Sequence, residues 1–176
     1  MAVVHGIIKD YGGDITIYSE IGKGTKFQIF LPLINKKEKV IDNITTTALP
    51  AGNERILFVD DEAGLCKVSK QIIERLGYKV DAQTSPEEAL DKFKQAAKLY
   101  DLVITDKTMP HFTGFDLARE IRNIRSDIPI ILCTGFNNQA DLSMAQEIGI
   151  KEIILKPIDK QQIAEAIRKV LDKKGL

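Results

Sequence analysis

The sequence has 176 residues, in which 25 lysines and arginines balance 25 aspartates and glutamates, and 44% of its residues are hydrophobic. This length and apolar content suit one ordinary domain with an attachment. The zero net charge gives no electrostatic case for binding nucleic acid or an anionic membrane. No run approaches the ~20 apolar residues of a membrane span, and no signal peptide opens the chain. The two cysteines are typical of a reduced compartment, so a soluble cytoplasmic protein is predicted.

Residues 1–34 form the first compositional segment. A short apolar helical run, Ala2–Tyr11, ends at a pair of glycines. Two runs that alternate polar and apolar residues follow, Asp14–Ser19 and Thr25–Leu31, and the loop between them contains glycine. The pattern predicts a helix followed by a β-hairpin. Residues 35–53 hold three lysines, a threonine run, a proline and a glycine, which is typical of a linker.

From Arg55 onward, apolar strands alternate with helical periods, which assigns residues 54–176 to one domain. The alternation predicts right-handed crossovers, and therefore a parallel sheet with helices on both faces. The expected strands are Ile56–Val59, Lys79–Gln83, Leu102–Thr105, Ile130–Leu132 and Glu152–Leu155.

The helical periods between these strands have recognisable starts and stops. The first places Leu65, Val68 and Ile72 on one apolar stripe and stops at Gly77. The run Ser85–Glu88 combines a capping box with proline at the first helical position. Weaker or later stripes are Leu117, Ile121 and Ile124; Ala145 and Ile148; and Ile163, Ile167, Val170 and Leu171.

Polar side chains follow four of the five strands, at the end where α/β domains place their chemistry. Asp60 and Asp61 follow the first strand, Asp106 the third, Thr134 the fourth and Lys156 the fifth. A single acid after a strand most often caps the next helix. Five polar residues at the carboxyl ends of four strands indicate a functional site instead.

The acids of this cluster need a positive charge between them. If the first and third strands are neighbours, three carboxylates converge, and each close pair would cost about 4 kcal/mol at about 4 Å and an effective dielectric near 20. Lys156 supplies one positive charge, and an oxygen-bound divalent ion supplies the rest. Mg²⁺ typically takes one or two carboxylates plus phosphate oxygens. A carboxylate beside Mg²⁺, a lysine and the Thr134 hydroxyl is what an aspartyl-phosphate intermediate needs.

These residues, with Met109-Pro110 and Gly114 after the third-strand aspartate, carry a family resemblance. Residues 54–176 resemble the receiver domain of bacterial two-component response regulators. The resemblance implies an α/β, flavodoxin-like, doubly wound sheet of five parallel strands in the order 2-1-3-4-5, here with an N-terminal α-β-β extension. It also implies a phosphorelay function, in which a phosphohistidine donates its phosphoryl group to the domain.

The resemblance assigns Asp106 as the phosphoacceptor and as a member of the Mg²⁺ site. It makes Asp61 a direct metal ligand and Asp60 a more indirect one. The backbone carbonyl of Thr108 is a further expected ligand.

In the same family pattern, Lys156 and Thr134 bind the phosphoryl group, and Lys156-Pro157 is expected to be a cis bond. One departure concerns the position three residues before the lysine. Many receivers carry Tyr or Phe there, and the aromatic ring swings inward on phosphorylation. Here the residue is Ile153, so an aromatic readout is excluded, while the part of the switch that depends on Thr134 can remain.

Residues 1–34 are similar to the last helix and final hairpin of a histidine-kinase ATPase domain. The Gly-Gly pair, the S-E-x-G-K-G-T loop and the terminal Leu-Pro carry this resemblance; an unrelated α-β-β extension is the alternative. Neither the Asn-bearing metal-binding helix of that family nor its main nucleotide-binding glycines are present, so no ATP binding and no kinase activity are expected. The order implies the C-terminal piece of a hybrid histidine kinase, either a truncation or an internal start.

The expected partners are a histidine kinase or a histidine phosphotransfer protein. A homodimer through residues 1–34 is a further expectation, because an isolated hairpin is marginal in water and its alternating apolar residues need a covering surface. Docking of the same segment on its own receiver is the alternative.

Two other functions remain open. The receiver fold can serve only for docking, although the complete set of five site residues argues against that. The second is an aspartyl-nucleophile phosphatase of the haloacid dehalogenase type. That chemistry requires a nucleophile and an acid two residues apart on the first strand, whereas Asp60 and Asp61 are adjacent. A flavin-binding flavodoxin lacks support, because no hydroxyl-rich phosphate loop follows the first strand.

Three further side chains are candidates with simpler explanations. His5 is expected to be a packing or surface residue rather than a phosphodonor. His111, in the loop after Asp106, is expected to be exposed, with a tuning role in phosphotransfer as the alternative. Cys133 is expected to be a small core residue.

Overall fold

The computed structural model of the chain describes residues 2–32, 49–135 and 139–172. The chain divides into two compact units, residues 1–45 and 46–176. None of the helices in these described ranges has the length and apolar character required to cross a bilayer.

The first unit is the predicted helix and hairpin. Helix α1 (Ala2–Asp10) leads into strand β1 (Asp14–Glu20), which pairs antiparallel with β2 (Gly24–Phe30). The side chain of Ile8 on α1 is buried beside Gly13, where the chain turns from the helix into the hairpin.

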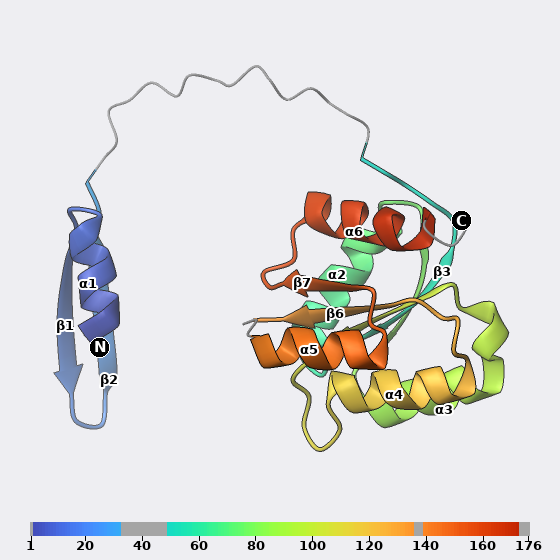
Figure 1. Cartoon of the computed structure of the whole chain (residues 1–176). Coiled ribbons are helices and arrows are strands. Elements are labelled where there is room, and N and C mark those ends of the chain that lie inside the picture. Colours follow the sequence, from blue (N-terminus) through green and yellow to red (C-terminus); the bar gives the residue numbers. More distant parts are fainter. Residues whose placement is uncertain (1, 33–48, 136–138, 173–176) are drawn as a thin grey trace. The chain divides into compact units, whose positions relative to one another are not determined.

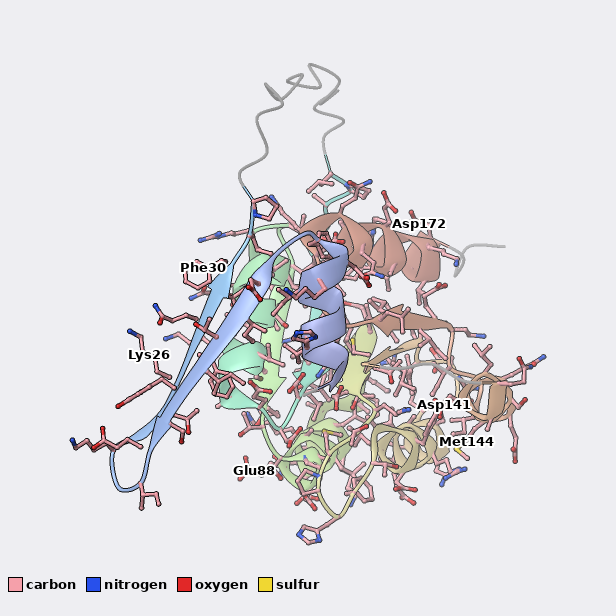
Figure 2. The ribbon with its side chains drawn as sticks, turned by 90° about the vertical axis from the view of Figure 1, so that its left-hand side faces the viewer. Lys26, Phe30, Glu88, Asp141, Met144 and Asp172 are labelled. Atoms are coloured by element: carbon pink, nitrogen blue, oxygen red, sulfur yellow. The ribbon has the colours of Figure 1, made fainter. Side chains whose placement is uncertain are left out.

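One face of this hairpin is apolar and uncovered within the described residues. Ile17 and Phe27 are cross-strand partners and are each 52% exposed, and Ile29 is 55% exposed. The opposite face is mixed, and Figure 2 shows Lys26 and Phe30 projecting from β2. The first unit therefore leaves a set of large apolar side chains without a core of its own.

The second unit is built on a five-stranded parallel sheet of order β4-β3-β5-β6-β7. Renumbered within the unit, this order is the predicted 2-1-3-4-5, and the flavodoxin-like class is confirmed. The strands are β3 (Arg55–Val59), β4 (Lys79–Gln83), β5 (Leu102–Asp106), β6 (Ile130–Thr134) and β7 (Glu152–Leu155).

The three inner strands are near-continuous apolar runs because both of their faces are covered. Figure 1 shows α2 and α6 on one side of the sheet and α3, α4 and α5 on the other. The helices are α2 (Ala63–Glu74), α3 (Pro86–Ala96), α4 (Gly114–Ile124), α5 (Gln139–Ile148) and α6 (Lys160–Asp172), with a short 3₁₀ turn, η1 (Ala97–Leu99), after α3.

Local capping fixes two of these helices. Ser85 accepts a hydrogen bond from the Glu88 backbone N–H, with Pro86 in the first turn of α3 as predicted. The Ser85 hydroxyl donates to Glu87, so no reciprocal bond from Glu88 completes a capping box there. A complete capping box is instead present at the start of α4.

The apolar stripe of α2 is only partly a core stripe, and this differs from the expectation. Ile73 is buried, but Leu65 is 41% exposed and Val68 is 53% exposed. Leu65 and Val68 therefore do not pack in the core; they line a groove together with Ile158.

The segment before β3 packs against the rest of the second unit. Leu49 contacts the core cluster under α2 and α6, and the Gly52 N–H donates to the Leu76 carbonyl. Gly77 has φ of +99°, and a Cβ atom there would lie 2.4 Å from the Gly52 carbonyl oxygen. Only glycine suits that conformation at that approach.

Substitution of Gly77 should therefore destabilise the second unit. Gly77→Ala is expected to lower the free energy of unfolding by about 1–3 kcal/mol, because a left-handed backbone is strained for alanine and its Cβ collides with Gly52. Gly64→Ala is the matched control, since nothing lies near its Cβ position inside α2 and alanine favours a helix. Urea denaturation measures both; equal stability of the two variants contradicts the prediction.

Candidate functional site: the acidic cluster at the strand ends

Two buried carboxylates meet where β3 and β5 finish. The two strands are parallel neighbours, with Val59 opposite Thr105, so the residues that follow come together. Asp60 is 1% exposed and Asp106 is 5% exposed. Two such acids are almost never buried without a cationic partner.

Lys156 is that partner. Its Nζ lies 2.7 Å from Asp60 Oδ2 and 2.7 Å from Asp106 Oδ1. Burial alone would lower the pKa of the lysine ammonium, but the hydrogen bonds to Asp106 and Asp60 outweigh it and raise the pKa. The lysine therefore stays charged and bridges two carboxylates that would otherwise repel each other.

The remaining carboxylate oxygens are oriented by the backbone. The Glu62 N–H donates to Asp60 Oδ1 at 3.0 Å, and the Thr108 N–H donates to Asp106 Oδ2 at 2.8 Å. Each carboxylate is thus held by one backbone donor and one lysine contact, which fixes its plane before any ligand arrives.

The other site residues fall into two groups. Thr134 ends β6, is 2% exposed, and its carbonyl accepts the Lys156 N–H at 2.8 Å, which sets it beside the lysine. Asp61 is exposed, and so is the side chain of Thr108. The strand-end pattern predicts three crowded carboxylates; the structure buries two of them and leaves Asp61 at the surface.

The loop after β5 closes tightly on the end of that strand. The Gly114 N–H donates to the Lys107 carbonyl at 3.0 Å, and a Cβ atom on Gly114 would lie 2.0 Å from the Asp106 carbonyl oxygen. Met109 is buried beneath this loop. The Lys156-Pro157 bond on the opposite side of the site is cis, as expected.

The donor atoms fit a hard divalent cation. Within the described ranges, no three acidic, histidine or cysteine side chains are arranged to hold a metal ion directly. Mg²⁺ does not require three, because it keeps several waters and takes one or two carboxylates. Asp60 and Asp106 offer oriented carboxylate oxygens, and exposed Asp61 directly follows Asp60 in the chain.

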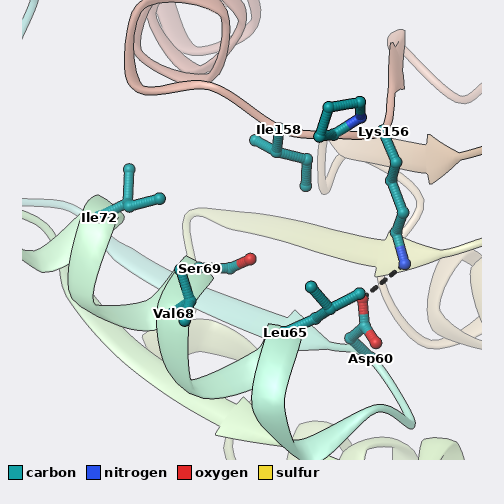
Figure 3. A pocket seen from close by; sticks show the side chains of 8 residues that line it. Asp60, Leu65, Val68, Ser69, Ile72, Lys156 and Ile158 are labelled. Atoms are coloured by element: carbon teal, nitrogen blue, oxygen red, sulfur yellow. Dashed lines mark hydrogen bonds and ion pairs between the residues drawn. The ribbon is translucent and has the colours of Figure 1, made fainter. Parts of the chain in front are cut away.

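An apolar groove of about 430 Å³ opens beside the cluster. Figure 3 shows Leu65, Val68 and Ile72 along α2 on one side, Ile158 on the other, and Asp60 with Lys156 at one end. The exposed part of the α2 stripe is therefore the wall of a groove that leads to the buried acids. The sequence shows the apolar stripe of α2. Its helical spacing alone does not distinguish residues that pack in the core from residues that line a groove.

The weaker candidates stand apart from this chemistry. His5 is exposed on α1, and His111 is exposed with φ of 62° in the loop after β5. Cys133 is buried in β6, and its burial raises the pKa of the thiol to about 12, so the thiol stays protonated and inert at neutral pH.

One contact near the site was missed by the sequence analysis. Lys107 directly follows Asp106, and its Nζ lies 2.8 Å from Asp141 Oδ2 on α5. No local pattern pairs two residues 34 positions apart.

The model of the response regulator receiver domain matches residues 56–168, most of the second unit and more than half of the chain. The chain belongs to the response regulator receiver domain family. Receiver domains act in two-component signalling and interact with histidine kinases or phosphotransfer proteins. The family assignment agrees with the strand-end cluster found above.

Two curated relatives match nearly the whole chain. The aerobic respiration control sensor protein ArcB of Escherichia coli K12 is 31% identical over 98% of the chain, and sensor kinase CckA of Brucella abortus is 32% identical over 98%. The chain spans only 22% and 19% of their lengths. Among solved structures, the Thermotoga maritima response regulator TrrA, in complex with Mg²⁺ and beryllofluoride, is 35% identical with a TM-score of 0.60, covering 67% of this chain and 99% of its own.

Removal of the bridging cation should uncover the repulsion between the two buried acids. Lys156→Met is expected to lower the free energy of unfolding by about 2–4 kcal/mol in chelator, because it leaves buried carboxylates without their partner. Lys169→Met is the control; its pair with Glu152 is 53% and 24% exposed and should contribute less than about 1 kcal/mol. Urea denaturation at pH 7.5 measures both.

The pH dependence has a defined sign. Because the folded-state pKa of Lys156 lies above its ordinary value of 10.5, the stabilisation is fully present below that value and is lost as the pH rises through the higher one. The difference between the wild type and Lys156→Met should thus be constant from about pH 7 to 9. If Lys156→Met and Lys169→Met lose similar amounts of unfolding free energy, the stabilising role of the Lys156 bridge is contradicted.

Proposed function

We propose that the chain is a phosphoacceptor receiver in a phosphorelay and that Asp106 takes the phosphoryl group from a phosphohistidine. The observation that carries the proposal is the buried pair Asp60–Asp106 bridged by Lys156 at the ends of adjacent strands. In the transfer, a carboxylate oxygen of Asp106 forms a bond to phosphorus while the bond from phosphorus to the donor imidazole nitrogen breaks. The electron pair of that bond remains on the imidazole.

The protein's own groups suit this reaction. Lys156 is already charged and in contact with the acceptor, so it can neutralise the phosphoryl oxygens. Thr134 supplies a hydroxyl at the end of the neighbouring strand. Asp60, Asp61, Asp106 and the Thr108 carbonyl would hold Mg²⁺, which when bound supplies further charge neutralisation.

The groove beside the cluster supports a helical donor. Leu65 and Val68 are exposed apolar side chains at the entrance to the acids, a surface that can bury the apolar stripe of a helix bearing the phosphohistidine. The partner class is a histidine kinase or a histidine phosphotransfer protein. A cytoplasmic location is part of the proposal, and the two free, buried cysteines fit a reducing compartment.

The proposal is tested with beryllofluoride, which imitates a phosphoryl group on aspartate. The wild type should bind it only with Mg²⁺, and Asp106→Asn should abolish both this binding and labelling by acetyl phosphate, because the nucleophilic carboxylate is gone. Asp91→Asn, at an exposed position of α3, is the control and should behave as wild type. Circular dichroism checks that each variant folds.

A wild type that binds no beryllofluoride in Mg²⁺ would point to a receiver fold used only for docking. Full labelling of Asp106→Asn would move the acceptor role to another carboxylate.

For residues 1–34, we propose the C-terminal helix and hairpin of a histidine-kinase ATPase domain in a hybrid histidine kinase. The support is that both sensor relatives match 98% of the chain, well beyond the receiver domain. The uncovered apolar face around Ile17 and Phe27 also fits a fragment that belongs on a larger surface. In this chain, we propose that a second copy covers that face and forms a homodimer.

Self-association should therefore depend on that face. Light scattering of the full chain is expected to show a dimer at high micromolar concentration, and Phe27→Lys should shift it to monomer by placing a charge in the apolar contact. Lys26→Glu, on the opposite face of the same strand, is the control. A shortened chain that starts at Thr46 retains Leu49 and should be monomeric. A monomeric full chain excludes the dimer.

A further inference from the structure

A second mostly buried ion pair lies next to the acceptor. Lys107 Nζ and Asp141 Oδ2 are 2.8 Å apart, and the two side chains are 21% and 15% exposed. Pairs on the surface of the same unit, such as Lys94–Asp91, are 53% and 69% exposed. Because solvent and salt screen a buried pair much less, this contact constrains its two elements more than a surface pair does.

Lys107 is itself firmly held. Its backbone N–H donates to the Cys133 carbonyl on β6 at 2.8 Å, and its carbonyl accepts the Gly114 N–H at the start of α4. It is also the residue directly after Asp106. Any element fastened to the Lys107 side chain is therefore fastened to the acceptor end of β5.

That element is α5, which buries fewer residues than its neighbours. Ala145 is the one fully buried residue among its ten, whereas α4 and α6 each bury five. At the far end, Arg122 donates to the Gly149 carbonyl at a long 3.4 Å. Figure 2 shows Asp141 and Met144 on this helix, and Met144 is 37% exposed. Polar contacts therefore contribute to the position of α5, and the Asp141 pair is shorter than the Arg122 contact.

The side chain beneath α5 cannot supply a rotamer switch. Ile153 is half-buried and packs with Phe115, Leu132 and Ala145. A β-branched side chain is stiff at χ1, so it fills this space without a swinging ring.

We propose that Asp141 is a positioning residue for phosphoryl transfer: through Lys107 it holds the first turn of α5 against the acceptor strand, and so couples occupancy of the acceptor site to the position of α5. The inference rests on the proposed phosphoacceptor function. By linkage, an ion pair that favours the occupied site is itself favoured by occupancy, by the same factor.

The test is a beryllofluoride titration of the full chain in saturating Mg²⁺. Asp141→Asn and Lys107→Met should each weaken binding roughly three- to tenfold, and the double variant no more than either single one, because both remove the same contact. Asp141→Glu keeps the charge and should retain most of the affinity. Glu152→Gln, which breaks the 2.6 Å pair between β7 and α6, is the matched control and should stay within about twofold.

Two results overturn the inference while leaving the function intact. If the wild type binds beryllofluoride and Asp141→Asn behaves like Glu152→Gln, the pair is only structural. If Asp141→Asn tightens binding while Lys107→Met weakens it, Lys107 acts on the phosphoryl analogue directly and Asp141 merely restrains it. A wild type that binds no beryllofluoride removes the proposed function, and the positioning role falls with it.

Hydrogen exchange supplies a readout besides binding. In the wild type, Mg²⁺ with beryllofluoride should slow exchange of the α5 backbone amides relative to those of α6. Asp141→Asn should reduce this slowing, and Glu152→Gln should keep it. Equal slowing in all three proteins contradicts the coupling.

Discussion

The second unit is organised around one ammonium group shared by two buried carboxylates. Lys156 reaches from the end of β7 to Asp60 and Asp106, the residues at the ends of β3 and β5. The shared contact ties an edge strand to two central strands at their reactive ends. Breaking such an arrangement leaves a buried charge uncompensated, which is more costly than losing a surface pair. The same contact holds the Asp106 carboxylate in place beside a cation.

The sheet makes that contact possible because it fixes where the strands end. Its inner strands are apolar on both faces, so a shift by one residue would place Asp60 or Asp106 in the core without Lys156. The helices around the sheet are held unequally. Five residues of α6 are buried in the core, whereas Ala145 is the one buried residue of α5, and Ile148 is partly buried. The helix that follows β6 is therefore packed less deeply than α6.

Much of this could be predicted from the sequence, since strand ends in an α/β alternation converge and five polar residues mark them. The bridging role of Lys156 followed from the charge balance alone. The exposure of Asp61 could not be predicted, because adjacent acids after a strand look alike until the turn between β3 and α2 is known. The exposure of Leu65 and Val68 could not be predicted either, because these residues have the same helical spacing as residues of the core. The pair Lys107–Asp141 depends on tertiary placement and has no local signal.

The receiver's response to phosphorylation is also constrained by what packs under α5. Ile153 packs against Phe115, Leu132 and Ala145, so an aliphatic side chain stands where many receivers carry an aromatic ring. A change at Asp106 must then reach the surface through the backbone and its polar contacts. The backbone of Lys107 is bonded to β6 and to the start of α4, and its side chain connects this point next to Asp106 with α5. In the proposed coupling, the ion pair between Lys107 and Asp141 takes the place of a rotating ring.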